Sequence, residues 1–335
     1  MTAELDSPTY DVAIVGGGPA GLTAALWLGR YLHSVVLVDS GDPRNWETRA
    51  VNGFTGRPGI RPADLRGDTR DECRKYGVAL VDGFVARIRR ASDDCFVLEY
   101  DPMPVTKAEV DAPGSGAPRD ATDNERRVET RTISARRLLL AFGLKDEWPK
   151  VPGLRQVYGS TAHVCPDCDG YESRDKRVIV VASGRKAAGL ALALTTWTRR
   201  IMVCTNGEPA KLGESERGKL DALDIPVLEE RIVCIHPRGS EIHAVELEGG
   251  RLIDCDKIYF SLGQRPADDL GAQLACERDE GGHMVIDDRN HTSVRNVFAA
   301  GDIVPGPQLA IVAAAEGAVA ALAIHKSLLP EERKL

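Results

Sequence analysis

Two cysteines separated by two residues form the most reactive pair in the sequence. Cys165 and Cys168 lie in the stretch HVCPDCDGYE, and Asp169 follows the second cysteine directly. This spacing allows an intramolecular disulfide, and a helix that starts at the pair can lower the pKa of one thiol. A structural zinc site would need two more ligands, and the sequence offers no second close Cys/His pair. The pattern therefore favours dithiol–disulfide exchange over zinc binding, and we assign no metal site.

Asp169 has a chemical role available in this exchange. The rate of thiol–disulfide exchange depends on the protonation of the leaving sulfur, and a neighbouring carboxyl group can supply or accept that proton. A turn or helix-capping role is the alternative for Asp169. His163, two residues before Cys165, also has two interpretations, because it can stabilise a thiolate or occupy a turn without a functional role.

A glycine-rich turn near the N-terminus predicts a dinucleotide site. Residues 10–15 (YDVAIV) indicate a buried strand, GGGPAG follows, and a helical pattern then leads to a second strand that ends at Asp39. In G-x-G-x-x-G the first glycine permits the tight turn, the second lets the backbone reach a pyrophosphate, and the third allows close helix–strand packing. The terminal acid can accept hydrogen bonds from a ribose. The predicted contacts of this unit are Gly16, Gly18, Pro19, Ala20, Gly21, Asp39 and Ser40.

A second unit of the same kind starts at Arg177 with VIVVASGRKAAGLALALTTW. Its glycine pattern is damaged, because the three key positions hold Ala182, Gly184 and Ala187. A Cβ at the first position restricts the turn. We expect this unit to fold as a strand–turn–helix–strand module and to be a poor dinucleotide site.

A third segment, near the C-terminus, predicts further cofactor contacts. A buried strand is followed by Ala300, Gly301 and Asp302, and an apolar helical stretch follows Gln308. An acid after a glycine turn suits sugar hydroxyls, and the helix can direct its N-terminal amides at an electron-rich cofactor atom. The apolar stretch 309–324 contains Glu316 and is shorter than the roughly 20 residues that span a bilayer. We therefore expect a buried helix and no membrane contact.

Composition narrows the class of protein. The 335 residues include 43 Lys+Arg and 50 Asp+Glu, so the formal charge is −7, and without a basic run we expect no nucleic-acid partner. The length is sufficient for two domains. The N-terminal stretch lacks a basic n-region, and we expect a cytoplasmic protein. Residues 101–131, with four prolines and two glycines, predict a long solvated loop.

These blocks, in this order, resemble low-molecular-weight thioredoxin reductase-type flavoproteins. The resemblance implies an α/β fold of two Rossmann-like, three-layer FAD/NAD(P)-binding domains, the second inserted in the first. It assigns residues 1–147 and 266–335 to a split FAD domain and 148–265 to a degenerate NAD(P)-type domain that carries the cysteines. It also implies a homodimer, a redox role for Cys165 and Cys168, with Cys168 nearer the flavin, and an acid/base role for Asp169. Besides the first glycine-rich unit, it assigns FAD contacts to Asn45, Ala141, Gly143, Gly301, Asp302, Gln308 and Leu309.

The chain departs from the NADPH-dependent members of this family. Those members carry an H-R-R motif whose cations hold the 2′-phosphate, whereas this chain has Thr205, Asn206, Gly207 and Glu208 there, and only Lys211 keeps a cation. We therefore expect NADPH to be a poor reductant. The loss of the motif, together with the segment DSGDPRN, resembles a subgroup that contains dithiol oxidases and ferredoxin-dependent or diflavin-linked disulfide oxidoreductases.

The predicted activity is that of an FAD-dependent disulfide oxidoreductase that acts on a thioredoxin-like protein or a small dithiol. Asp169 favours this activity, because the dithiol oxidases tend to have His after the second cysteine. The electron donor would be a ferredoxin or a second FAD, for which Trp46, Tyr171 or Trp197 offers a stacking face. The alternatives are an oxygen-using dithiol oxidase, an NADPH thioredoxin reductase, and a flavin-binding redox sensor without turnover.

Overall fold

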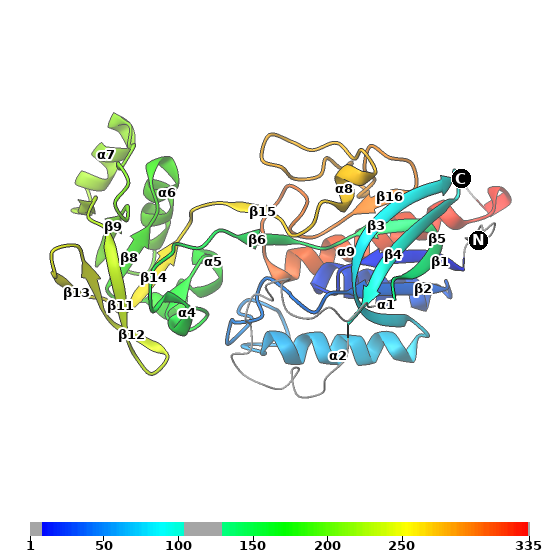
Figure 1. The fold of residues 1–335 in the computed structure, drawn as a ribbon, viewed down its shortest axis with the longest axis horizontal. Helices are drawn as coiled ribbons and strands as arrows, with labels where there is room; N and C mark the ends of the chain where they lie inside the picture. The colour runs from blue at the N-terminus through cyan, green and yellow to red at the C-terminus, as the bar shows by residue number, and fades with distance from the viewer. Residues whose placement is uncertain (1–8, 104–128, 334–335) are drawn as a thin grey trace. The chain divides into compact units, whose positions relative to one another are not determined.

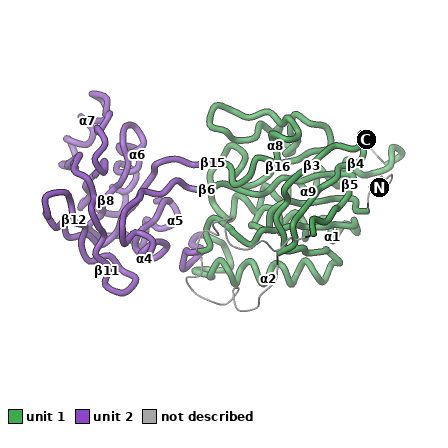
Figure 2. The backbone as a smooth tube through the Cα atoms, in the orientation of Figure 1, with its two compact units in different colours: residues 1–46, 54–145, 266–335 green, residues 47–53, 146–265 purple. Residues whose placement is uncertain are grey.

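The chain forms two compact units in the computed structural model, which describes residues 9–103 and 129–333. Unit 1 comprises residues 1–46, 54–145 and 266–335, and unit 2 comprises residues 47–53 and 146–265 (Figure 2). Most of the predicted long loop, residues 104–128, lies outside the described residues.

Unit 1 is built on a mainly parallel sheet with helices against it (Figure 1). The apolar, β-branched runs that predicted strands form β1 and β2, and both are largely buried because they lie inside the sheet. The strands of this unit are β1 (Tyr10–Val15), β2 (Val35–Asp39), β3 (Ala79–Ser92), β4 (Cys95–Pro102), β5 (Arg131–Leu140) and β16 (Val297–Ala299). The helices are α1 (Pro19–Arg30), α2 (Pro62–Lys75), α8 (Leu270–Gln273), α9 (Ala310–Leu328) and the 3₁₀ turn η2 (Glu331–Arg333).

The strand register brings the carboxyl ends of β1, β2, β5 and β16 to one edge of the sheet. Val12 of β1 pairs in parallel with Val35 of β2 on one side and with Arg137 of β5 on the other. β16 adds beyond β5, with Val297 opposite Leu138. Ligands of open α/β sheets bind at this edge, and the glycine turn after β1 lies on it.

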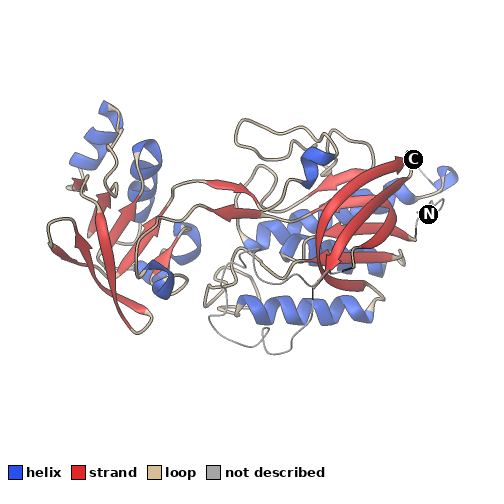
Figure 3. Cartoon of the chain, viewed as in Figure 1, coloured by secondary structure: helices blue, strands red, loops and turns tan. Residues whose placement is uncertain are grey.

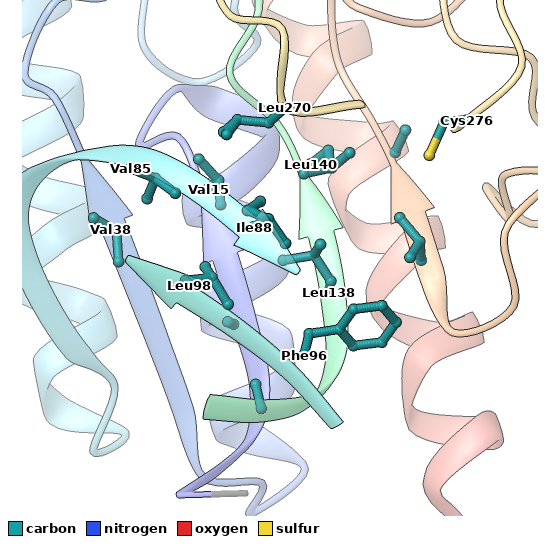
Figure 4. Packing of buried hydrophobic residues seen from close by; sticks show 14 of the residues in the cluster. Val15, Val38, Val85, Ile88, Phe96, Leu98, Leu138, Leu140, Leu270 and Cys276 are labelled. Atoms are coloured by element: carbon teal, nitrogen blue, oxygen red, sulfur yellow. The ribbon is translucent and has the colours of Figure 1, made fainter. Parts of the chain in front are cut away.

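Apolar side chains pack on both faces of this sheet. On one face an antiparallel ribbon of β3 and β4 covers the parallel strands, and Val15, Phe96, Leu98 and Leu138 fill the space between the strands (Figure 4). On the other face α1 and α9 pack closely, and a Cβ at Gly317 of α9 would overlap the backbone of Ala20. By length and composition alone α9 is apolar enough to cross a membrane, but one side of it is buried against α1, as in a core helix.

Unit 2 contains a parallel sheet of five strands in the order β10-β9-β8-β14-β7 and an antiparallel sheet of three strands, β11-β12-β13 (Figure 3). The predicted strand–turn–helix–strand module is present as β8 (Val178–Val181), α6 (Gly184–Leu194) and β9 (Ile201–Cys204). The other strands are β7 (Ala162–His163), β10 (Val227–Leu228), β11 (Ile232–Arg238), β12 (Glu241–Leu247), β13 (Leu252–Asp254) and β14 (Lys257–Phe260). The helices are α4 (Leu154–Val157), α5 (Pro166–Asp169), η1 (Tyr171–Ser173) and α7 (Glu214–Asp221).

A two-stranded pairing of β6 (Leu144–Asp146) with β15 (Gln264–Pro266) joins the two connections between the units. The α/β fold class predicted from the sequence is confirmed.

Candidate active site

The two cysteines of the C-x-x-C motif form a disulfide at the start of α5. Their Cα atoms lie 5.3 Å apart. Cys165 is the N-cap residue, Pro166 occupies the first helical position, and the backbone N–H of Cys168 donates to Sγ of Cys165 at 3.1 Å. An amide that donates to this sulfur favours its thiolate form after reduction. The dithiol interpretation of the pair therefore has a structural basis.

The segment after Cys168 is fixed by buried hydrogen bonds. The hydroxyl of Tyr259 donates to the backbone carbonyl of Asp169 at 2.7 Å, and the hydroxyl of Ser173 donates to the same carbonyl at 3.2 Å. The carboxylate of Asp169 lies 3.3 Å from Nδ1 of His163, and both residues are buried. His163 therefore contacts Asp169. The sequence shows only that His163 lies two residues before Cys165, so it does not predict this contact.

Close packing holds the turn from two sides. A Cβ at Gly170 would lie 2.5 to 2.6 Å from the ring of Trp197, so only glycine fits there. The side chain of Asn52, from the segment 47–53, donates to the carbonyl of Cys168 at 3.1 Å. Trp197 thus has a packing role. Tyr171 is 66% exposed and has the guanidinium of Arg174 5.3 Å above its ring.

The glycine turn of unit 1 has the geometry that a bound pyrophosphate needs. Gly16 has a φ of +106°, and a Cβ there would lie 2.7 Å from the carbonyl carbon of Ala141. A Cβ at Gly21 would overlap the carbonyl oxygen of Gly16. A Cβ at Gly18, in contrast, would meet no protein atom within 4 Å. The protein's own packing thus accounts for Gly16 and Gly21, whereas the open space at Gly18 fits the close approach of a ligand phosphate.

Asp39, the predicted ribose acceptor, is buried at the end of β2 and is held by two arginines of α2. Its carboxylate accepts from Arg66 and lies 3.6 Å from Nη1 of Arg70. The backbone N–H of Gly41 donates to it at 3.2 Å. Burial alone would raise the pKa of Asp39, but Arg66 and the backbone hydrogen bonds hold that pKa below its usual value. The carboxylate is therefore ionised, which strengthens the hydrogen bonds that it can accept from ribose hydroxyls.

Arg44 joins two residues that were predicted to contact the flavin. Its Nη1 lies 3.0 Å from Oδ2 of Asp302 and donates to Oε1 of Gln308 at 2.6 Å. In the sequence the segment DSGDPRN only marks the resemblance to a subgroup, and no local pattern there indicates a contact of Arg44 with Asp302. The loop after β2 and the C-terminal segment thus meet at one place, although 258 residues separate Arg44 from Asp302.

Glu316 is a second contact that the sequence did not reveal. Its carboxylate accepts from the backbone N–H of Gly301 at 2.7 Å. Burial raises the pKa of Glu316, and the charge of Asp302 raises it further, against the effect of the Gly301 hydrogen bond. In the sequence Glu316 only interrupted an apolar stretch, whereas in the fold it supports the Gly301–Asp302 turn from α9.

A cleft opens beside the glycine turn. Gly17, Gly18 and Pro19 line it from the turn and Asn45 lines it from the loop after β2, while Pro62, Leu65, Arg66 and Thr69 line it from α2. The other predicted contacts have defined places too. Ala141 donates to the carbonyl of Val15 at 2.8 Å, Gly143 has a φ of +71°, and Leu309 is the N-cap residue of α9. Ala20 is buried and Ser40 is half-buried. Direct contact of each of these residues with FAD stays a prediction.

The turn after β8 in unit 2 is poor in glycine, and its polar groups form hydrogen bonds with neighbouring protein groups. The backbone N–H of Gly184 donates to the carbonyl of Ala210 at 2.7 Å. The side chain of Asn206 accepts from the N–H of Ile232 at 2.9 Å, and the hydroxyl of Thr205 donates to the carbonyl of Glu208. Within the described residues, no group of three or more His, Cys, Asp and Glu side chains is placed to hold a metal ion.

The sequence profile of the pyridine nucleotide-disulphide oxidoreductase family matches residues 10–317, and the chain belongs to this family. Membership implies FAD binding, and the open space at Gly18 and the ionised Asp39 fit that cofactor. Within the family the chain is thioredoxin reductase-like, as the sequence predicted, and is a flavin-dependent oxidoreductase that acts on sulfur.

Three relatives illustrate this likeness. A Claviceps purpurea protein described as thioredoxin reductase tcpT is 27% identical over 309 residues, which cover 88% of this chain and 87% of the relative. A Bacillus anthracis structure described as a candidate thioredoxin reductase, TrxB, is 30% identical with a TM-score of 0.80, and the match covers 95% of this chain and 98% of that one. The structure of HlmI is 30% identical with a TM-score of 0.82, with coverage of 95% and 92%.

Proposed function

We propose that the protein is an FAD-dependent disulfide oxidoreductase that does not use NADPH efficiently. Bound FAD would supply or accept two electrons, and the residues of the chain would exchange them with a substrate through sulfur. Cys165 and Cys168 alternate between a disulfide and a dithiol, and the substrate is a thioredoxin-like protein or a small dithiol. The relatives described as thioredoxin reductases support a thioredoxin-like substrate.

The observation that carries the NADPH part of the proposal is the internally bonded turn of unit 2. In a dinucleotide site the first amides of the helix face a pyrophosphate. Here the N–H of Gly184 donates to the carbonyl of Ala210, and the loop after β9 presents Glu208 in place of a cation. A carboxylate repels a 2′-phosphate, and the missing guanidinium groups would otherwise hold it. We infer that the electron donor or acceptor is a ferredoxin or a second FAD.

Anaerobic titration of the purified holoprotein with NADPH, NADH and reduced ferredoxin tests this proposal, after the FAD content per protomer has been measured. We expect flavin reduction by the ferredoxin, or a second FAD per protomer, and slow reduction by both nicotinamides. Rapid flavin reduction by micromolar NADPH would overturn the proposal in favour of an NADPH thioredoxin reductase. Peroxide release with a small dithiol in air would identify a dithiol oxidase instead.

We further propose a cytoplasmic homodimer. The resemblance to low-molecular-weight thioredoxin reductases supports the dimer. Sedimentation of the holoprotein tests the dimer, because a monomer at micromolar concentration would contradict it.

A further inference from the structure

Three ionisable side chains lie buried one beside the next, beginning at the residue that follows Cys168. Oδ2 of Asp169 lies 3.3 Å from Nδ1 of His163, and Nε2 of His163 lies 3.1 Å from Nζ of Lys257. Nζ of Lys257 also donates to the carbonyl of Ser160 at 2.9 Å. Asp169, His163 and Lys257 are 8%, 5% and 9% exposed. Charged side chains are rarely buried to this degree unless they are paired, so this arrangement is unusual.

The backbone fixes the three residues relative to one another. His163 ends β7 and Lys257 begins β14, and these strands are parallel neighbours with Tyr259 opposite His163. Asp169 is the last residue of α5, which starts at Cys165. Two sheet strands and the helix α5 therefore supply one member each.

Hydrogen-bond donors determine where the protons are. An ammonium group can only donate, so Nε2 of His163 must accept from Lys257 and Nδ1 then carries the hydrogen. The hydrogen on Nδ1 is then on the nitrogen that faces Asp169, whose Oδ2 lies 3.3 Å away. If the lysine proton moves to Nε2 while the Nδ1 proton moves to the carboxylate, Asp169 becomes protonated and Lys257 neutral. The total charge of the three residues is the same in both arrangements.

We propose that His163 and Lys257 are positioning residues that hold a proton and pass it to Asp169 for exchange at the Cys165–Cys168 disulfide. The inference rests on the proposed function and deepens it. During exchange a substrate thiolate attacks one sulfur, the enzyme S–S bond breaks, and the departing sulfur takes the proton of Asp169. The second substrate thiol then loses its proton, closes the substrate disulfide and releases the other enzyme sulfur, which takes up that proton. The proton freed when the first substrate thiol ionised returns to Asp169 through Lys257 and His163. The substrate dithiol is oxidised by two electrons, and the enzyme disulfide is reduced to two thiols.

The surroundings of Lys257 favour release of a proton from its ammonium group. Burial lowers the pKa of Lys257, and Lys176 lowers it further, while Asp169, Glu172 and Glu241 act in the opposite direction. A lysine with a lowered pKa can part with its proton at a smaller cost than an exposed one.

The test measures exchange at the sulfurs without using the flavin signal. The holoprotein is mixed with dithiothreitol, quenched with an alkylating reagent, and the reduced fraction of the cysteine pair is followed by mass spectrometry from pH 6 to 9, in H₂O and D₂O. We expect Lys257→Met to slow exchange by roughly 10- to 100-fold near pH 7, and to remove the D₂O effect. Lys257→Arg keeps a cation but cannot release its proton, so it should be slow as well.

Tyr259→Phe is the matched control, because Tyr259 donates to the backbone carbonyl of Asp169 and its ring packs 5.4 Å from that of His163, so the change disturbs packing at the same place and removes no member of the Asp169–His163–Lys257 set. We expect this variant to exchange within about twofold of the wild type and to keep its D₂O effect. Two results would overturn the proposed proton relay from Lys257 through His163 to Asp169. One is an exchange rate of Lys257→Met equal to that of the wild type. The other is a loss of exchange rate in Tyr259→Phe as large as that in Lys257→Met, which would indicate a packing defect.

The relay and the proposed function fail in different ways. If the cysteine pair of the wild type does not exchange electrons with the flavin, the proposed function is wrong. The dithiothreitol assay still reports on the relay in that case, because it follows the sulfurs directly.

Discussion

Replacement of Gly18, the middle glycine of the glycine turn of unit 1, should weaken FAD binding with little effect on folding. Gly18 has a φ of −77°, and a Cβ there would meet no protein atom within 4 Å, so alanine is compatible with the backbone. The change from glycine to alanine at a helix N-cap should lower the stability of the apoprotein by only about 0.5–1 kcal/mol. The added methyl group occupies the space through which a phosphate reaches the turn. The loss of one charge-assisted hydrogen bond, about 1.5–3 kcal/mol, should weaken FAD binding roughly 10- to 150-fold.

Two further variants make this prediction specific. Gly16→Ala should destabilise the apoprotein by about 2 kcal/mol or more, because the φ of +106° and the nearby backbone of Ala141 do not admit a side chain. Gly67→Ala, in the middle of α2, adds a methyl group in open space away from the cleft lining and should be neutral or stabilising by up to about 1 kcal/mol. Urea unfolding of the apoproteins and FAD titration by fluorescence quenching provide the data. The reasoning is refuted if Gly18→Ala binds FAD as tightly as the wild type, or if its apoprotein is as unstable as that of Gly16→Ala.

Three other substitutions test single contacts of the two units. Arg44→Met removes the cation that joins Asp302 to Gln308, and we expect a roughly 5- to 20-fold loss of FAD affinity in the same titration; an unchanged affinity would show that this contact does not organise the site. Glu316→Ala leaves the N–H of Gly301 without its acceptor and should lower stability by about 1–3 kcal/mol, whereas Glu316→Gln should lose less. Hydrogen bonds from Arg177 lower the pKa of Asp256 to about 2. The ionised Asp256 therefore contributes fully to the free energy of unfolding above pH 4, and this contribution is lost as the pH falls toward 2. After allowance for solvent screening this contribution is about 1 kcal/mol, and urea unfolding at pH 2.5 and 5 should show a smaller pH effect in Asp256→Asn than in the wild type.

The sequence revealed the parts of the fold that depend on local pattern. The run YDVAIV, the glycine turn and the strand ending at Asp39 predicted β1, α1 and β2, because buried parallel strands and a phosphate turn each have a composition of their own. β5, in contrast, begins at Arg131, several residues before its apolar run at 138–140. Its first half pairs with β4 in the antiparallel ribbon and carries exposed polar residues, which an apolar-run criterion does not detect.

The site residues that the sequence missed depend on contacts between distant segments. Lys257 begins a short apolar strand, where a lysine usually indicates an exposed end, and only the pairing of β14 with β7 buries it beside His163. Arg44 and Glu316 gain their roles from neighbours more than ten residues away along the chain. Burial and pairing of this kind follow from tertiary packing, and a single sequence contains no local pattern for them.

The central claim is that electrons pass between the flavin and the Cys165–Cys168 pair. Anaerobic reductive titration of the holoprotein with dithionite, in parallel with Cys165→Ser and Cys168→Ser, measures it most directly. The wild type should take up two more electrons per protomer than either variant before its flavin is fully reduced, because its disulfide is reduced together with the flavin. Equal electron uptake by all three proteins, with identical flavin spectra throughout, would contradict the claim.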